Sequence, residues 1–172
     1  YGTHNELSIG SVGSMGCSRS GNFALQNSDL LIVIGSRLSS LTTGDEYCKF
    51  ARNAEKIIID IDQNEHFKKG IKIDKFICLD AKVLLDKLNK SNLNLDLSDW
   101  VKKCKHWKKV FPKVEKEFKS KDLIDLYDLA NKLSNILNEG STLVTDSGLI
   151  EVILPSNIAF KNGVSCIHSS SQ

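Results

Sequence analysis

Asp29-Leu30-Leu31-Ile32-Val33-Ile34-Gly35-Ser36-Arg37 is the stretch that decides the fold. Its run of apolar residues predicts a buried strand of a parallel sheet, because strands of that kind lack the alternation of half-solvated strands. The strand ends in a glycine, a serine and an arginine. In an open α/β sheet, the loops at the carboxyl ends of the strands form the crevice in which ligands bind. We therefore expect a parallel sheet with a ligand site just after residue 34.

The same order of a strand followed by polar residues recurs downstream. Lys56-Ile57-Ile58-Ile59-Asp60-Ile61-Asp62 is a second apolar run that ends in two acids, and residues 75–79 form a third run that ends at Asp80. Helices are predicted at 18–28 and 81–89, capped by Ser18 and Asp80. Alternating strands and helices are typical of a doubly wound α/β fold, and two such units in succession indicate a nucleotide-shaped ligand.

The second half of the chain repeats this pattern after a linker. The predicted elements, in order, are a polar linker at 90–96, a long helix from Ser98 with Trp100, Val101, Cys104, Trp107 and Val110 on one side, a helix from Lys121-Asp122 to Leu137, a strand at 142–145 leading to Asp146-Ser147-Gly148, and a short strand at 164–167. The sequence therefore predicts a second α/β unit that begins near residue 122.

Composition excludes several classes of protein. With 172 residues, 41% hydrophobic and 26% charged, the chain is typical of a globular protein, and its net charge of +2 indicates neither nucleic acid nor membrane as a partner. The lysines between 102 and 121 are interpreted as a solvated helix face, since Glu115 and Glu117 are interleaved with them. The five scattered cysteines indicate reduced thiols in a cytoplasmic protein, and we predict no metal site.

Three motifs could hold a ligand, and each also has a purely structural interpretation. Gly35-Ser36-Arg37 could bind a phosphate through the arginine, or it could be an ordinary turn with a surface arginine. Asp60 and Asp62 could accept hydrogen bonds from a ribose or an adenine edge, or Asp62 could cap the next helix. Gly10, Gly13 and Gly16 resemble a phosphate-binding loop without forming the GxGxxG fingerprint. We assign no catalytic residue, because no histidine pairs with a nucleophile in a recognisable motif.

Taken in order, these residues resemble the thiamine-diphosphate-dependent enzymes, in particular the acetolactate-synthase-like group. The motifs that carry the resemblance are Gly10-Ser11-Val12-Gly13-Ser14-Met15-Gly16, the helix from Asn22 to Asp29, Gly35-Ser36-Arg37, Thr43-Gly44, Ile59-Asp60-Ile61-Asp62, Asp80-Ala81-Lys82, Trp107-Lys108, Val144-Thr145-Asp146-Ser147-Gly148 and His168-Ser169-Ser170-Ser171-Gln172. Residues 147–151 lack the Gln-His that acetolactate synthases often have there.

The resemblance implies an assignment for most of the chain. Residues 1–90 would be part of a central domain with a six-stranded, Rossmann-like parallel sheet, which holds FAD or ADP in some members and nothing in others. Residues 91–121 would be a linker with a long helix, and 122–172 the start of the diphosphate-binding domain. The residues it implies at the nucleotide are Gly13, Gly16, Gly35, Ser36, Arg37, Asp60, Asp62 and Asp80, and those at the thiamine diphosphate are Ser147 and Gly148.

The implied function is that of an enzyme that decarboxylates a 2-keto acid and transfers the product to an acceptor, with thiamine diphosphate and Mg²⁺. The family builds its active site between subunits, so a homodimer or tetramer is expected. We expect the chain to be a fragment of a longer protein that is inactive by itself. The alternative from the residues alone is a nucleotide- or FAD-binding Rossmann-like module without thiamine-dependent catalysis.

Overall fold

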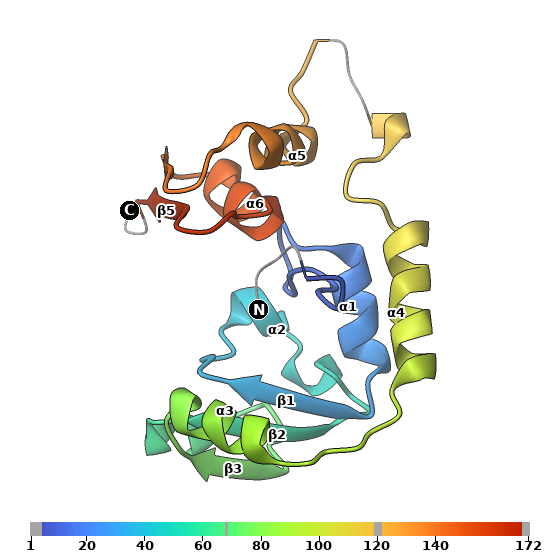
Figure 1. Ribbon diagram of the computed structural model, residues 1–172, viewed down its shortest axis with the longest axis vertical. Coiled ribbons are helices and arrows are strands. Elements are labelled where there is room, and N and C mark those ends of the chain that lie inside the picture. Colours follow the sequence, from blue (N-terminus) through green and yellow to red (C-terminus); the bar gives the residue numbers. More distant parts are fainter. Residues whose placement is uncertain (1–4, 68, 119–121, 170–172) are drawn as a thin grey trace.

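The structure, a computed structural model, describes residues 5–67, 69–118 and 122–169 and contains two parallel sheets. The first has the order β1 (Leu30–Ile34), β2 (Glu55–Asp60), β3 (Lys75–Cys78), with Ile32 opposite Ile57 and Ile59 opposite Ile77. The second pairs β4 (Thr142–Thr145) with β5 (Ser165–His168). The predicted strands and their parallel arrangement are confirmed. Figure 1 shows the first sheet at the bottom and the second part at the top.

Local capping explains where the first helices begin. The Ser18 hydroxyl accepts from the Gly21 amide (2.9 Å) at the start of α1 (Arg19–Asn27), and Asp80 Oδ1 accepts from the Lys82 and Val83 amides at the start of α3 (Ala81–Lys90). Both predicted caps are confirmed. Short helical turns fill the connections: α2 (Ser40–Thr43), η1 (Tyr47–Lys49) and η2 (Gln63–Phe67).

The prediction that the first strand is buried is correct for only one of its faces. Val33 is buried, whereas Leu30, Ile32 and Ile34 are 46%, 51% and 37% exposed. Leu30, Ile32 and Ile34 alternate along β1 and therefore share one face, and that face stays exposed in the described part of the chain. The sheet has three strands in the described residues, not the six that the resemblance implies. The buried side packs with a core formed by Leu38, Phe50, Ala51, Ala54, Ile58 and Ile71.

A long helix joins the two parts. α4 (Ser98–Val110) lies along α1, as Figure 1 shows, and the two are held by aromatic contacts. The Phe23 ring lies 6.3 Å from that of Trp107 and 4.5 Å from that of Phe111, and Trp107 meets Trp100 edge-on at 5.7 Å. The predicted apolar side of this helix is confirmed, with Val110 exposed at its end. A 3-10 turn, η3 (Lys116–Phe118), follows.

The second part has two helices packed on each other. α5 (Leu126–Ile136) begins later than predicted, because Asp125 Oδ1 caps it by accepting from the Tyr127 amide at 2.7 Å; residues 119–121 lie outside the described residues. α6 (Leu149–Asn157) was not predicted. Leu154 of α6 packs with Ala130 of α5 and with Ile158 in a buried core.

No helix among the described residues is both long enough and apolar enough to cross a membrane. The domain limits near residues 90 and 121 stay predictions. The end of α3 at Lys90 and the start of α4 at Ser98 leave residues 91–97 without a helix or a strand between them.

Candidate functional site

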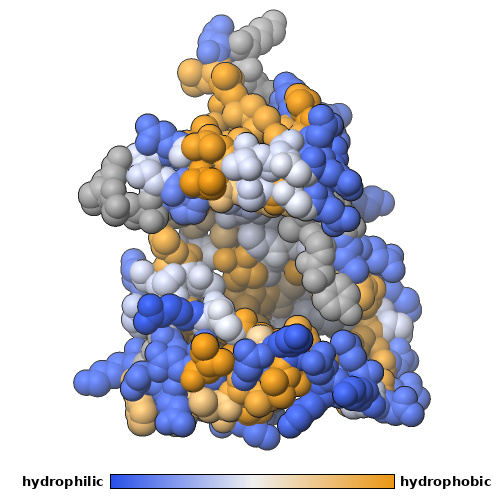
Figure 2. All heavy atoms as spheres, turned by 60° about the vertical axis from the view of Figure 1, so that its left-hand side comes forward, coloured by the Kyte–Doolittle hydropathy of each residue, from blue (hydrophilic) through white to orange (hydrophobic). Residues whose placement is uncertain are grey.

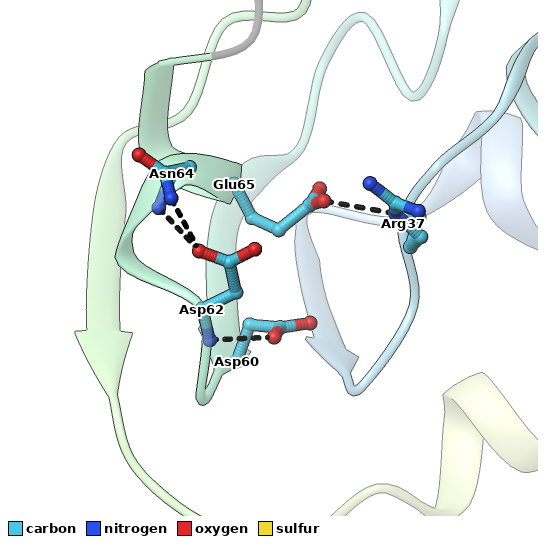
Figure 3. A network of polar contacts seen from close by, with 5 residues as sticks. All are labelled: Arg37, Asp60, Asp62, Asn64 and Glu65. Carbon is cyan, nitrogen blue, oxygen red and sulfur yellow. Dashed lines mark hydrogen bonds and ion pairs between the residues drawn. The ribbon is translucent and has the colours of Figure 1, made fainter.

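The carboxyl ends of β1 and β2 bring an arginine and several acids together (Figure 3). Gly35 continues β1 by donating its amide to the Ile59 carbonyl at 2.9 Å, with φ +60° and open space where a Cβ would lie. Arg37 Nε then donates to Glu65 Oε1 at 3.0 Å. The Arg37 side chain is 83% exposed and that of Glu65 only 7%. A buried carboxylate therefore holds an otherwise exposed guanidinium at this edge, and Ser36, half-buried, lies between the glycine and the arginine.

The two acids after β2 use part of their oxygens within the chain. Asp60 Oδ1 accepts from the Asp62 amide at 3.0 Å, and Asp62 Oδ1 accepts from both nitrogens of Asn64 at 2.9 Å. Asp62 thus starts η2, which is the structural role considered for it from the sequence. Both acids still lie at the same strand ends as Arg37, so a ligand role is compatible with the geometry.

Asp80 lies at the same edge of the sheet, because the Leu79 amide donates to the Asp60 carbonyl at 3.0 Å. One of its oxygens caps α3. Asp80 remains exposed, and the helix that it caps, α3, begins at this edge of the sheet.

The glycine loop before α1 is fixed by contacts with the chain itself. The Asn22 side chain accepts from the Gly13 amide and donates to its carbonyl, and the Ser14 amide donates to the Leu41 carbonyl. A Cβ on Gly13 would lie 2.7 Å from the Leu41 oxygen, and one on Gly16 would lie 3.0 Å from Val152 Cγ1. Close packing therefore already requires glycine at both positions, whether or not a ligand also approaches the loop.

A second candidate site lies at the carboxyl ends of β4 and β5. The hydroxyl of Thr145 is buried without a partner among the described residues, and the Ser147 amide is turned back onto Asp146 Oδ1 (2.8 Å). Gly148 has φ +99° and open space at its Cβ position, and no side chain caps α6 there. A glycine turn at an uncapped helix start offers amide donors to an anion, as phosphate sites do.

One pair beside this turn has no counterpart in the sequence-based prediction. Glu151, in the first turn of α6, lies 3.3 Å from His168 Nδ1 at the end of β5. A carboxylate so close to the turn opposes an incoming anion unless its charge is offset by the histidine. Thr145, directly across from His168 in the register, completes this edge.

The structure divides the predicted residues into three groups. It brings Gly35, Ser36, Arg37, Asp60, Asp62 and Asp80 to one edge, and Ser147 and Gly148 to the edge of the other sheet. Gly13 and Gly16 lie in the loop before α1, packed against Leu41 and Val152. Sequence reasoning missed Glu65, whose only signal was its place three residues after Asp62. It also missed Thr145 and Glu151. Within residues 5–67, 69–118 and 122–169 no group of three or more His, Cys, Asp or Glu is placed to hold a metal.

The clearest electrostatic perturbation lies away from both sites, at the amino ends of β2 and β3. Lys56 is only 4% exposed, and burial lowers the pKa of its ammonium, which donates to the Ala54 carbonyl at 3.1 Å. Asp74 has a lowered pKa because Lys72 and the Lys56 amide hydrogen-bond to its carboxylate. We regard these groups as structural.

Comparison with known proteins gives a consistent family. Residues 1–88 match the model of the "Thiamine pyrophosphate enzyme, central domain". The chain is 31% identical over 155 residues to a probable acetolactate synthase large subunit of Methanococcus aeolicus, and 33% identical over 151 residues to one of Methanocaldococcus jannaschii; each match covers 83% of this chain. It is 33% identical over 118 residues, 65% of its length, to the acetolactate synthase large subunit of Cyanidium caldarium. The matches span only 20%, 24% and 25% of the Cyanidium, Methanococcus and Methanocaldococcus proteins.

Proposed function

Because the chain belongs to the family of thiamine pyrophosphate enzymes, we propose that it supplies the central domain and the first part of the diphosphate-binding domain of an acetolactate-synthase-like enzyme. That enzyme would remove CO₂ from a 2-keto acid and transfer the remaining fragment to an acceptor. Since the chain corresponds to a quarter or less of its relatives, the rest of the active site would come from other parts of a longer protein.

The observation that carries this proposal is the turn after β4. Thr145 has a buried hydroxyl without a partner, Gly148 leaves open space, and the first amides of α6 have no side-chain cap. These features fit the diphosphate of thiamine diphosphate, with Ser147 and Gly148 beside it. When bound, the cofactor would supply the electron sink for decarboxylation. The residues of this chain would bind and orient the diphosphate, and Glu151 with His168 would set the charge beside it.

The edge of the first sheet suits a nucleotide, for which we propose FAD or ADP. Gly35 and Ser36 leave the backbone accessible, and Arg37 uses only its Nε toward Glu65, so the rest of its guanidinium can reach a phosphate. Asp60 and Asp80 would face the adenosine part. Bound FAD would make the full-length protein yellow.

The remaining parts of the proposal rest on the family alone. Mg²⁺ would be held by residues outside this chain together with the diphosphate. The active site would form between subunits of a homodimer or tetramer. A cytoplasmic location is proposed separately, from the five scattered cysteines, which favour reduced thiols. The relatives do not support the alternative of a nucleotide-binding module without thiamine-dependent catalysis, since the three relatives described above are acetolactate synthase large subunits or probable ones.

Two matched glycines test the proposed diphosphate turn. Gly148 and Gly140 both have positive φ, +99° and +75°, and open space at Cβ, so alanine strains both backbones without a clash. In the full-length protein with Mg²⁺, we expect Gly148→Ala to weaken thiamine diphosphate binding about ten-fold or more, by distorting the amides that hold the phosphates. Gly140→Ala, at the opposite end of β4, should leave the affinity unchanged. Calorimetry showing equal affinities for both variants would contradict the assignment.

The isolated chain provides a second measurement. Calorimetry of residues 1–172 with thiamine diphosphate and Mg²⁺ should show no binding, because the chain lacks a metal cluster in its described residues and presents only one side of the site. Micromolar binding by the isolated chain would overturn this part of the proposal.

A further inference from the structure

A cavity of about 290 Å³ lies between the segment before α1, the end of α4 and the end of α6. Two lysines and four serines supply its polar side chains, and its lining includes no acid among the described residues: Lys108, Lys113, Ser8, Ser11, Ser20 and Ser156. The residues of α6 that line it are at the opposite end of that helix from Gly148. No lining residue belongs to either strand-end site, so the cavity is separate from both.

The two lysine ammonium groups hydrogen-bond only to backbone carbonyls in the described chain. Lys108 Nζ donates to the Ser8 carbonyl at 2.8 Å, and Lys113 Nζ donates to the Asn157 carbonyl at 3.0 Å. Asn157 is the last residue of α6, where a helix end carries about half a negative charge. Two full positive charges therefore remain largely uncompensated beside the cavity.

The acids of the adjoining segments are already paired with other cations. Glu6, two residues before Ser8, forms an ion pair with Lys105 at 3.2 Å, and Glu115 forms one with Arg19. Within the part of the chain that the structure describes, no carboxylate lies within ion-pair distance of either cavity lysine.

The two lysines also affect each other. Burial lowers the pKa of the Lys113 ammonium, and the positive charge of Lys108 lowers that pKa further. Like charges that share a cavity cost free energy, and an anion bound between them would remove that cost. The arrangement favours a negatively charged ligand.

The serines divide into two pairs. The hydroxyls of Ser11 and Ser20 already donate, each at 3.0 Å, to the carbonyls of Ser156 and Ile9. The hydroxyls of Ser8 and Ser156 form no hydrogen bond within the described residues, and both serines are half-buried in the lining. These two hydroxyls, with the remaining protons of the two ammonium groups, can donate to the oxygens of an anion.

We propose that this cavity binds a phosphate group, either as inorganic phosphate or as the phosphate ester of a small molecule. Phosphate carries nearly two negative charges at neutral pH, which matches the two lysines, whereas a carboxylate supplies one. Its oxygens can accept from both ammonium groups and from the serine hydroxyls. Phe111, Pro155 and Ile158 form an apolar wall on which the carbon chain of an ester would lie. The volume suits a small ligand.

Trace acetylation of lysines by acetic anhydride measures occupancy at the cavity itself, without any measurement of activity. The full-length protein is acetylated in KCl alone, or with phosphate, glycerol 3-phosphate or acetate at the same ionic strength, and each lysine is followed by peptide mass spectrometry. Lys103 and Lys109 are internal controls, because both are exposed on α4 and neither lines the cavity. Phosphate bound elsewhere on the protein does not alter this local signal.

We expect millimolar phosphate to slow acetylation of Lys108 and Lys113 about three-fold or more, since the bound anion covers both amines and keeps them protonated. Lys103 and Lys109 should react at unchanged rates, and acetate should protect weakly. Stronger protection by glycerol 3-phosphate than by phosphate would support an ester as the ligand, and equal protection would support the free ion. Absence of protection, equal protection by acetate, or equal slowing at the control lysines would overturn the proposal.

A matched pair of variants tests whether the two lysines act on one ligand. In Lys113→Gln, the phosphate concentration that protects Lys108 should rise about ten-fold, because one charge-assisted contact is lost. Lys109→Gln, which removes a neighbouring charge outside the cavity, should leave that concentration unchanged. If both variants protect Lys108 equally well, Lys108 and Lys113 do not share a phosphate and the proposal is wrong.

Discussion

The strands of both sheets end in similar turns. The two sets of strand ends differ in how many of their polar groups are already hydrogen-bonded within the chain. After β1 and β2, Arg37 is paired with Glu65 and Asp62 with Asn64, so the polar groups are already held in place. After β4, no side chain caps α6 and the Thr145 hydroxyl lacks a partner in the described chain. Open space at the glycine is common to both turns, at Gly35 and at Gly148. The first site is therefore shaped by its own contacts, whereas the second has polar groups that a ligand could satisfy.

The largest expected effect comes from the cores beneath the two sites, and it should be the same in both. Ile58→Ala in the first core and Leu154→Ala in the second should each lower the free energy of unfolding by about 3 kcal/mol, because each leaves a cavity around a residue only 2% exposed. Urea denaturation followed by circular dichroism measures both. If either variant changes stability by less than about 1 kcal/mol, that core is less well packed than the structure shows.

Removal of a helix cap gives the next largest effect, and the loss of stability should be equal in the two regions. Asp80 and Asp125 each accept from two amides at the start of α3 and α5, so alanine at either position should cost about 1 kcal/mol. Asp86→Ala, inside α3 and outside its first turn, is the control. If Asp80→Ala lowers the free energy of unfolding no more than Asp86→Ala does, the cap is not formed in solution.

Arg37 tests whether the first site is built for binding more than for stability. Its own side chain is 83% exposed, but its partner Glu65 is only 7% exposed and loses a charge-assisted hydrogen bond, so Arg37→Ala should lower the free energy of unfolding by about 1 kcal/mol. The same change in the full-length protein should weaken ADP binding about ten-fold, since a guanidinium contact with phosphate is lost. Lys49→Ala, which breaks the exposed Lys49–Glu46 pair, is the control. If the Arg37 variant binds ADP with unchanged affinity, Arg37 is not part of the nucleotide site.

The smallest effect concerns Lys56, on the side of the first sheet away from its site. Burial lowers its pKa in the folded chain, so above that pKa the unfolded chain binds more protons. Stability should therefore rise as the pH increases through the folded pKa toward 10.5, the ordinary value for lysine. Urea denaturation from pH 7 to pH 10 should show this rise in the wild type and a smaller one in Lys56→Met. The same pH dependence in both would exclude Lys56 as its cause.

The features predicted correctly from the sequence are those determined by neighbouring residues. Ser18 and Asp80 cap the helices that directly follow them, and the apolar runs at 30–34 and 57–59 lie in strands, as short isoleucine- and valine-rich runs bounded by polar residues favour. The exposed face of β1 was missed, since a run of apolar residues does not reveal what covers each face. α6 was missed because Leu149–Asn157 lacks a clear helical period and contains Pro155.

Site residues were harder to predict when their partners are distant. Glu65 meets Arg37 across 28 positions, and Glu151 meets His168 across two elements, so no local pattern revealed either pair. Asp125 was overlooked as a cap because the helix was expected to begin at residue 121. Gly13 and Gly16 illustrate the converse: their spacing suggested a ligand, and the contacts show that close packing alone requires glycine there.

We propose above all that this chain works as part of a thiamine-dependent 2-keto acid enzyme. The most direct measurement is pyruvate consumption and acetolactate formation by the purified full-length protein, with and without thiamine diphosphate and Mg²⁺. We predict that acetolactate forms only when both are present, and that Gly148→Ala reduces the rate at limiting cofactor whereas Gly140→Ala does not. If no CO₂ is released from pyruvate or another 2-keto acid when thiamine diphosphate and Mg²⁺ are both present, the proposal is contradicted.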